Sequence, residues 1–590
     1  MILFLRFCLL MLSLSGYIWY LAHRFQILAE FAPAVVCAFI STLLFLAGCC
    51  NLLPEMTVLL FVGGLVLPAC LLYRKYKISA CRTKQPVTAR QKPCRRPFLV
   101  YAVFLCTALY FFLLLQKAHV TSYDNFSHWA TVVKDMLREN RMPNFQDPII
   151  RFQSYPLGSS LWIYYVCRIV GTAEGCMLWA QLLMMLCFLL CMAAFVHKEN
   201  RYCILALLFF AVWAASANNS IYELRVDTLL PMAGIAAFAI LFAYRQDPKK
   251  ALYTCCGIFI LLIQMKNSGI FFYAACLLFL AGSARKACQS KKLCFAGIGL
   301  AIPLFTMYLW KKHVAFAFAD GMDSKHSMNM AHFGEMAAKK SREDIALIGQ
   351  SILRRFTEFD NIEVKLLLLL TVVLLLFAVL LRKSGQTKKL LRLFAFCLFC
   401  AAAYTASLYA MYVFSMPMGE SAHLASYDRY ILSVLIFLYG ITMIVVMDAL
   451  RSTEAGTAGS RIAASVFLFF TVLLVFQVRQ KLPLLSGIPD FTRTKRCQLQ
   501  ELFKEHGIQE GDSCAIYCNG TDDDKRYLFY LTRYELWTDA VLVVREEELL
   551  EHQSELADYE HLIVWDSDER IETFLDDAGR EMDFKILLRQ

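Results

Sequence analysis

The chain has 590 residues, of which 58% are hydrophobic and only 18% charged, and this composition excludes a soluble globular protein. Its apolar residues come in runs of roughly 16–22, the length that a helix needs to cross the hydrocarbon core of a bilayer. The formal net charge of +11 does not indicate a nucleic-acid partner, because most of the excess lies in short loops between apolar runs. We therefore predict a polytopic α-helical membrane protein.

The apolar runs predict about fourteen membrane-spanning helices. In chain order they are residues 2–22, 31–50, 55–73, 98–116, 174–196, 202–217, 228–244, 251–265, 268–282, 293–310, 362–381, 389–410, 429–448 and 461–478. The first run lacks a basic segment before it and a small-residue cleavage site after it, so we expect a retained helix and not a signal peptide. The 23 cysteines lie mainly inside apolar runs, where a free thiol behaves as a small hydrophobe, so no zinc site or disulfide framework is predicted.

Lysine and arginine fix the expected orientation. The loop 74–96 carries nine basic residues and no acid, which is typical of a cytoplasmic loop. The alternation of sides then places the loops 117–173, 216–227, 266–267, 311–361 and 415–427 and the C-terminal tail outside. Two segments affect this alternation. Residues 157–170 are short and contain Arg168, so we predict an interfacial helix there, and residues 251–282 are predicted as two short helices that meet at Lys266.

From about Lys481 the chain becomes rich in acids and resembles a soluble domain. Strand-like runs at 514–517, 540–544, 561–565 and 584–588 alternate with helical stretches at 523–533, 545–557 and 568–579. This pattern predicts a small α/β domain with a mainly parallel sheet, acting as a lid on the substrate side or as a partner surface. The predicted division is residues 1–97 as accessory helices with a basic loop, 98–450 as the catalytic membrane core, 451–480 as the last helix and 481–590 as the α/β domain.

A polar stretch around Asp124 and His128 follows a wholly apolar helix. The two residues are four apart, so they share one face if a helix begins there. One interpretation is an N-cap aspartate beside an interfacial belt of Tyr123, Phe126 and Trp129. The other makes Asp124 a general base or a cation ligand with His128 beside it, because an acid at the mouth of a membrane helix is costly without a use.

Three further charged groups lie at predicted outer ends of helices. Arg225 and Asp227 precede one span, either as an ion pair or as part of a site. Lys266 lies between two short helices, where either snorkelling or a phosphate contact explains it. Arg429 opposes the positive-inside bias and needs an anionic partner, either Asp428 or a substrate phosphate. Because Asp124, Asp227, Lys266 and Arg429 share one predicted face of the membrane, we interpret them as a site.

These residues resemble the GT-C superfamily of polyprenyl-phosphate-sugar glycosyltransferases. The resemblance covers about residues 98–450 and depends on the order of several short motifs. These are an Asp beyond a membrane helix in the first outer loop, Tyr-Pro-x-Gly from Tyr155, Arg-x-Asp-x-Leu-Leu from Arg225, Lys-x-x-Gly from Lys266, and Arg-Tyr at Arg429 and Tyr430. The chain departs from the usual pattern in having a single Asp-Asn where many members have paired acids, Leu157 where a second proline is common, and three additional helices before the first matched one.

The resemblance implies that Asp124 is the catalytic base, that Asp227 is a second outer-loop acid, and that Lys266 and Arg429 hold the lipid phosphate. His128 is the third predicted catalytic residue. Predicted substrate contacts are Tyr123, Trp129, Tyr155, Arg225 and Tyr430. The implied partners are a sugar on a polyprenyl phosphate such as undecaprenyl phosphate and an envelope acceptor, at the outer face of a bacterial cytoplasmic membrane. No cofactor is predicted, and a divalent cation near Asp124 remains an alternative.

Three other functions remain open. A transporter or flippase for a lipid-linked saccharide also uses charges in a membrane cavity, although we find no repeated halves. A polysaccharide polymerase or ligase would use outer-loop histidines such as His313, His326, His332 and His423. A scaffold whose acidic tail recruits an envelope protein would not need the charged site.

Overall fold

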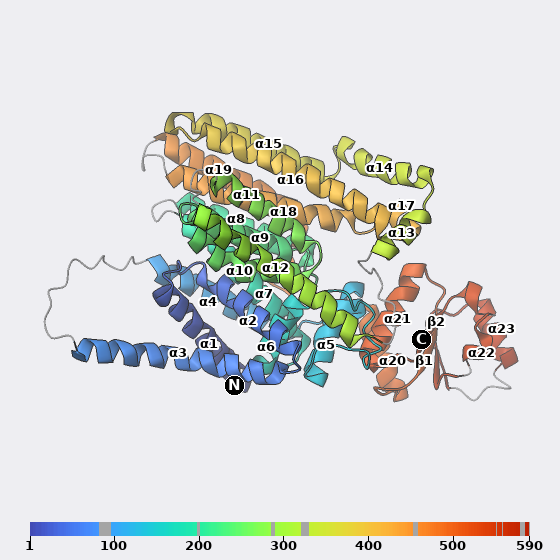
Figure 1. Ribbon diagram of the computed structural model, residues 1–590. Helices are drawn as coiled ribbons and strands as arrows, with labels where there is room; N and C mark the ends of the chain where they lie inside the picture. The colour runs from blue at the N-terminus through green and yellow to red at the C-terminus, as the bar shows by residue number, and fades with distance from the viewer. Residues whose placement is uncertain are drawn as a thin grey trace.

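The computed structural model describes residues 1–81, 96–196, 201–284, 290–319, 330–451, 458–549, 551–556, 558–578 and 585–588. Its helices run alongside one another in a bundle, and a small α/β domain lies at one end of that bundle (Figure 1). The helices α15, α16 and α19 lie on one side of the bundle, and α1 and α3 lie on the opposite side.

All fourteen predicted apolar segments are helical in the structure. They correspond to α1 (Ile2–Arg24), α2 (Ala32–Gly48), α3 (Leu53–Cys81), α4 (Arg96–Leu115), α7 (Glu174–Leu190), α8 (Arg201–Ser216), α9 (Leu229–Ala243), α10 (Pro248–Met265), α11 (Gly269–Ala284), α12 (Ser290–Ala317), α15 (Ile362–Leu380), α16 (Thr387–Phe414), α18 (Tyr427–Arg451) and α19 (Ala458–Gln477). The 3₁₀ turns η2 (Cys191–Phe195), η3 (Ala217–Asn219) and η4 (Arg382–Ser384) follow α7, α8 and α15.

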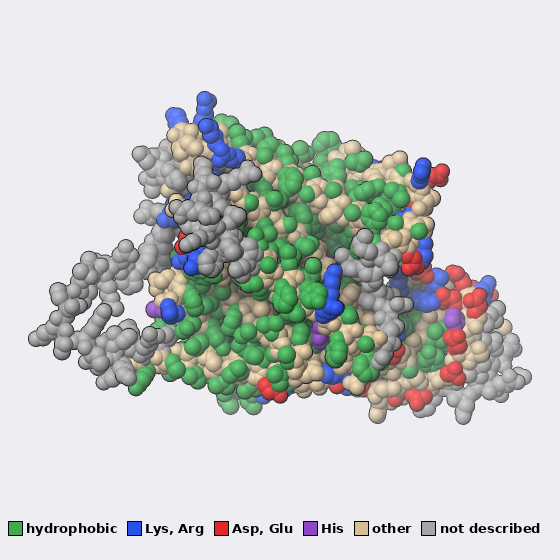
Figure 2. Space-filling model, viewed as in Figure 1, with side chains coloured by type: hydrophobic (Ala, Val, Ile, Leu, Met, Phe, Trp, Pro, Cys, Tyr) green, Lys and Arg blue, Asp and Glu red, His purple; other side chains and the backbone are tan. Residues whose placement is uncertain are grey.

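The predicted number of membrane spans is not confirmed. Within the described residues, seven helices are long and apolar enough to cross a membrane, or eight if the bent pair of α19 and η5 (Arg479–Leu485) is one span. Shorter apolar helices, among them α2 and α9, fall below the length that a span needs. The prediction of a polytopic helical membrane protein is thus confirmed, whereas the count of fourteen is not. Figure 2 shows a broad hydrophobic band across the middle of one face, with charged side chains gathered toward the two ends.

The predicted break between α10 and α11 is confirmed. Lys266 ends α10 with extended backbone angles, φ −163° and ψ 149°, and α11 begins three residues later. Gly269 permits this geometry, because a Cβ atom there would lie only 1.8 Å from the carbonyl oxygen of Leu262. The break presents the Lys266 side chain at the end of two apolar helices.

The outer loop 117–173 contains the π-helical turn η1 (Asn125–Trp129), α5 (Ala130–Glu139) and α6 (Gly158–Val170). The prediction of an interfacial position for residues 157–170 is wrong. Eleven of the thirteen residues of α6 are buried, and the helix packs against α7 and α2. The indole Nε1–H of Trp162 donates a 2.8 Å hydrogen bond to the carbonyl oxygen of Ala180 in α7, so an aromatic residue that suits an interface is used here in the protein interior.

The other outer loops are also helical where the structure describes them. Loop 311–361 contains α13 (Met330–Ala338) and α14 (Arg342–Thr357), and loop 415–427 contains α17 (Met418–Ala422). The side chain of Ser341 caps α14 by accepting a 3.1 Å hydrogen bond from the amide of Asp344. These helices lie at the same end of the bundle as the α/β domain (Figure 1).

The C-terminal domain has the predicted parallel sheet. Its strands are β1 (Cys514–Tyr517), β2 (Val541–Val544), β3 (His561–Val564) and β4 (Lys585–Leu588), all parallel and in the order β2-β1-β3-β4. The helices are α20 (Lys495–His506), α21 (Asp522–Leu536), η6 (Glu546–Glu548), α22 (Gln553–Leu556) and α23 (Glu569–Ala578). The predicted helix 545–557 is only the two short turns η6 and α22, and the sequence analysis did not predict α20.

Buried polar contacts fix this domain on the outer loops. The Arg496 guanidinium lies 2.7 Å from a Glu174 carboxylate oxygen at the start of α7 and 2.6 Å from Glu535, and it also donates to the carbonyl oxygen of Val120. Its side chain is only 5% exposed, so the pair is shielded from water. Tyr527 donates a 2.8 Å hydrogen bond to the carbonyl oxygen of Thr121. The domain is therefore docked directly beside the segment that carries Asp124.

Candidate functional site

A cavity of about 1230 Å³ opens between the outer ends of the helices and the C-terminal domain. Its walls come from η1 and the loop after α5, the α10–α11 break, the outer half of α16, the α17–α18 segment, and α20 and α21. The four charged residues Asp124, Asp227, Lys266 and Arg429 all line it. Sequence segments as much as three hundred residues apart thus meet at one place.

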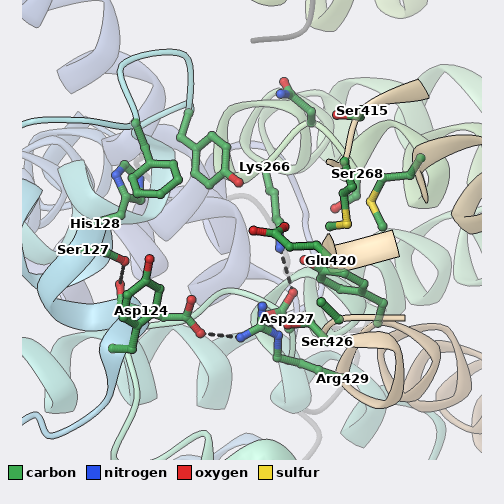
Figure 3. Close-up of a pocket in the computed structure, with 18 of the residues that line it drawn as sticks. Asp124, Ser127, His128, Asp227, Lys266, Ser268, Ser415, Glu420, Ser426 and Arg429 are labelled. Carbon is green, nitrogen blue, oxygen red and sulfur yellow. Dashed lines mark hydrogen bonds and ion pairs between the residues drawn. The ribbon is translucent and has the colours of Figure 1, made fainter. Parts of the chain in front are cut away.

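Asp124 lies immediately before η1 and faces the cavity (Figure 3). It occupies the predicted N-cap position of η1, but its side chain makes no capping hydrogen bond there. Its carboxylate instead accepts a hydrogen bond from Arg429 Nη1, and Arg225 Nη1 lies 3.4 Å away. Two guanidinium groups therefore contact the same carboxylate.

Asp227 pairs with Lys266 and with Arg429, the same arginine that contacts Asp124. Lys266 Nζ lies 2.9 Å from Oδ1 of Asp227, and Arg429 Nε lies 3.2 Å from Oδ2 (Figure 3). Burial by itself raises the pKa of Asp227, but Lys266 and Arg429 outweigh it and the pKa is lowered. Burial likewise opposes the charge on Lys266, yet Asp227 raises the pKa of that ammonium. Both groups are therefore charged at neutral pH.

Arg429 does not pair with its sequence neighbour Asp428. The Asp428 carboxylate contacts Arg355 of α14 instead, because residues 428 and 429 point to different faces of the first turn of α18. The anionic partners of Arg429 are Asp124 and Asp227, neither of which the sequence analysis proposed for it. The buried Arg429 Nε lies 3.2 Å from Asp227 but makes no hydrogen bond of good geometry within the described residues, so Asp227 holds it by charge alone.

Arg225 and Glu223 lie outside the cavity lining and stabilise the segment that carries Asp124. Arg225 does not line the cavity, so its predicted contact with substrate is not supported by its position. Its Nε lies 3.4 Å from Glu223, whose carboxylate accepts hydrogen bonds from Ser122 at 2.5 Å and from Asn125 Nδ2 at 3.1 Å. Asn125 Oδ1 in turn accepts from the amide of Leu224. These contacts fix the turn that carries Asp124. The sequence analysis did not predict this supporting role for Asn125, because a single asparagine beside an aspartate has no distinctive pattern.

His128 is buried in an aromatic pocket at the cavity wall. It is 4% exposed, and its ring packs edge-on against Trp129, Phe152 and Tyr155 with centroid distances of 4.7–5.8 Å. Burial, reinforced by the positive charge of Lys266, lowers the pKa of His128 to about 3. His128 Nε2 has no hydrogen-bond partner in the described part of the chain. The imidazole is therefore neutral at pH 7 and has one nitrogen left for a ligand.

The predicted aromatic contacts Tyr123, Trp129, Tyr155 and Tyr430 all line the cavity. Lys266 Nζ lies 4.9 Å from the centroid of the Tyr430 ring, a cation–π contact, and burial raises the pKa of Tyr155 to about 12. The sequence analysis missed one wall, which is largely apolar and comes from α11 and α16, with Phe271, Tyr404, Leu408 and Met411 among its residues. Another wall comes from the C-terminal domain, for which a lid on the substrate side was one of two predicted roles.

The surroundings of Asp124 do not fit a metal ion. Its carboxylate is occupied by guanidinium groups, and Asp227 is held by Lys266 and Arg429. Over the described ranges, the group of three side chains close enough to share an ion is Asp512, Glu560 and His561 in the C-terminal domain. Of the histidines considered for polymerase chemistry, His423 lines the cavity and His313 does not, whereas the side chains of His326 and His332 lie outside the described residues.

Comparison with known proteins adds a distant structural likeness. No protein-family model and no curated protein matches the chain. Among solved structures, the crystal structure of ArnT from Cupriavidus metallidurans bound to undecaprenyl phosphate matches 81% of this chain and 91% of that chain, with 10% sequence identity and a TM-score of 0.41. At that score the likeness carries no argument about the site. Membership of the GT-C superfamily therefore stays a prediction.

Proposed function

We propose that the protein is a membrane glycosyltransferase that moves a sugar from a polyprenyl phosphate, such as undecaprenyl phosphate, to an envelope acceptor on the extracytoplasmic side of a bacterial cytoplasmic membrane. One observation carries the proposal. Two partly buried cations, Lys266 and Arg429, and two carboxylates, Asp124 and Asp227, meet in a cavity that also has a largely apolar wall from α11 and α16. A lipid phosphate needs both features, a cationic pocket for its head and an apolar surface for its chain.

In this structure the cations of the cavity form ion pairs with its carboxylates. Lys266 is paired with Asp227, and Arg429 is paired with Asp124 and Asp227. A phosphate diester that enters the cavity competes with the two carboxylates for these cations, and the Nε–H of Arg429, which makes no well-aligned hydrogen bond with Asp227, is a first donor for it. Displacement of Asp124 from Arg429 would turn that carboxylate toward the acceptor.

Asp124 then serves as the general base. It accepts the proton of an acceptor hydroxyl while the hydroxyl oxygen forms a bond to the anomeric carbon of the donor sugar. The bond between that carbon and the phosphate oxygen breaks, and its electron pair stays on the phosphate. Lys266 and Arg429 stabilise the second negative charge that develops on the leaving phosphate. The neutral His128 offers a hydrogen bond to a sugar hydroxyl from its unpaired nitrogen.

The first test is an assay of the purified protein in nanodiscs with radiolabelled undecaprenyl-phosphate sugars. The wild type should transfer label to an envelope acceptor, or slowly to water. Asp124→Asn should lower this rate by about a thousandfold or more, because the base and its charge are lost together.

The matched control is Asp428→Asn, because Asp428 is next to Arg429 in the chain but pairs with Arg355 and does not line the cavity. It removes the same charge from the same end of the bundle and should keep the wild-type rate. Full activity in Asp124→Asn would overturn the mechanism. Movement of labelled lipid between leaflets without consumption of the donor would favour a transporter instead.

A further inference from the structure

The C-terminal domain supplies the water-facing wall of the cavity. Lys495 of α20 and Asp523, Asp524, Arg526 and Tyr527 of α21 line it together with the transmembrane residues. The wall is rigidly placed, because Tyr527 is bonded to Thr121 and the buried Arg496 to Glu174. A molecule that reaches Asp124 from the aqueous side would therefore meet α21.

The two ends of the cavity differ in charge. The inner end holds Lys266 and Arg429 against Asp124 and Asp227. The outer end holds three carboxylates, Glu420, Asp523 and Asp524, against only two cations, Lys495 and Arg526. An anionic ligand is thus favoured at the inner end once the carboxylates move aside, and disfavoured at the outer end.

The N-terminus of α21 does not reverse this preference. A helix N-terminus attracts anions through its free amides, but the first turn of α21 already contains Asp522, Asp523 and Asp524. Asp524 and Thr521 also form a reciprocal capping box, which satisfies the amide of each residue. The three carboxylates of the first turn therefore offset the positive end of the helix.

The contact that crosses the outer end is weak. Arg526 Nη1 lies 3.8 Å from Glu420 of α17, and Arg526 Nη2 lies 3.3 Å from Asp523. The Arg526 and Glu420 side chains are 46% and 32% exposed, so solvent screens the pair and an incoming hydroxyl group can replace either partner. Alternating carboxylates and a guanidinium offer both acceptors and donors to neighbouring hydroxyls.

We infer that α21, with Glu420 opposite it, forms the acceptor subsite, and that the acceptor is an uncharged or cationic polyhydroxyl glycan and not a polyanion. This inference rests on the proposed glycosyltransferase function and adds the class of acceptor. Arg526 and Glu420 are the specificity-determining residues. Hydroxyl groups of the bound glycan take the place of the ion pair between them.

The inference is tested by glycan binding in the absence of donor. The full-length protein in nanodiscs is titrated by calorimetry at low salt with three tetrasaccharides, namely tetraglucosamine, tetra-N-acetylglucosamine and tetragalacturonate. The cationic and neutral glycans should bind about tenfold or more tightly than the anionic one. Equal or tighter binding of tetragalacturonate, or no saturation by the other two at about 10 mM, would overturn the inference.

Variants locate the binding surface. Glu420→Gln should lower the affinity for tetraglucosamine about tenfold. Arg526→Gln should lower the affinity for tetra-N-acetylglucosamine by a similar factor. The control Arg570→Gln changes an exposed arginine of α23 that pairs with Glu546 and does not line the cavity, so its affinities should match the wild type. Unchanged affinity in both cavity variants would place the acceptor elsewhere. Hydrolysis of the labelled donor in the same preparations tests the proposed function separately, since it needs no glycan.

Discussion

The ion pairs around Asp227 set the energetic cost of the site. Asp227, Lys266 and Arg429 are largely removed from water, and Asp227 and Lys266 stay charged because their partners remain within ion-pair distance. Neutralising one member leaves its partners buried without compensation. The charged cluster is thus a place where single substitutions have large effects on stability as well as on activity.

We predict that Asp227→Asn lowers the free energy of unfolding by about 3–5 kcal/mol, because Lys266 loses its carboxylate. The double variant Asp227→Asn with Lys266→Met should recover part of this loss, since it removes the uncompensated ammonium. Thermal melting of the purified variants measures both effects. Equal melting temperatures for wild type and Asp227→Asn would contradict the buried pairing.

His128 gives a prediction for the dependence of stability on pH. Its pKa is lowered to about 3 in the folded protein, below the value of about 6.5 that an unfolded histidine has. The unfolded chain therefore takes up this proton first, and the stability that depends on the neutral imidazole is present above about pH 6.5 and is lost as the pH falls toward 3. His128→Phe should melt closer to the wild type at pH 7.5 than at pH 4.5, where it should be the more stable of the two. A constant difference between them would contradict a buried neutral histidine.

At the scale of elements, α20 and α21 are joined to α7 and η1 by the Arg496 cluster. The guanidinium has Glu174 on the membrane side and Glu535 on its own domain, so it connects two units that the sequence separates by more than three hundred residues. The Tyr534 hydroxyl adds a 2.8 Å hydrogen bond to Glu174. Docking of the domain therefore depends on a few buried polar groups.

We predict that Arg496→Ala releases the C-terminal domain from the outer loops and costs about 3–5 kcal/mol, since Glu174 and Glu535 are left without their cation. Limited proteolysis should then cut between residues 478 and 495, where the wild type resists. Lys504→Ala, in the last turn of the same helix α20, serves as the control because Lys504 is exposed. Resistance equal to the wild type in Arg496→Ala would show that other contacts hold the domain.

At the scale of the whole molecule, residues of the predicted outer loops 117–173, 216–227, 266–267 and 415–427 and of the C-terminal tail line one cavity at one end of the bundle. That arrangement agrees with the orientation expected from lysine and arginine, because the basic loop 74–96 was assigned to the opposite side. The location of the C-terminal domain outside the cytoplasm stays a prediction.

Reporter fusions test this orientation. Alkaline phosphatase fused after Gln590 should be active, because this enzyme needs an oxidising compartment to form its disulfides. Green fluorescent protein fused at the same point should not fluoresce. The pattern should reverse for fusions made after Arg451, one predicted span earlier. A fluorescent fusion at Gln590 would place the cavity on the cytoplasmic side.

The sequence by itself determined the helices, the break at Lys266 and the parallel α/β domain, because apolar runs and strand periods are local properties of the chain. It also selected the four charged residues that line the cavity, through the cost of placing charge beside lipid. Only the tertiary structure decided which charges pair. Arg429 pairs with Asp124, 305 positions away, and not with its neighbour Asp428. Helix α21 of the C-terminal domain lines a cavity of the membrane domain. No local pattern predicts these contacts, because they depend on side-chain direction and long-range packing.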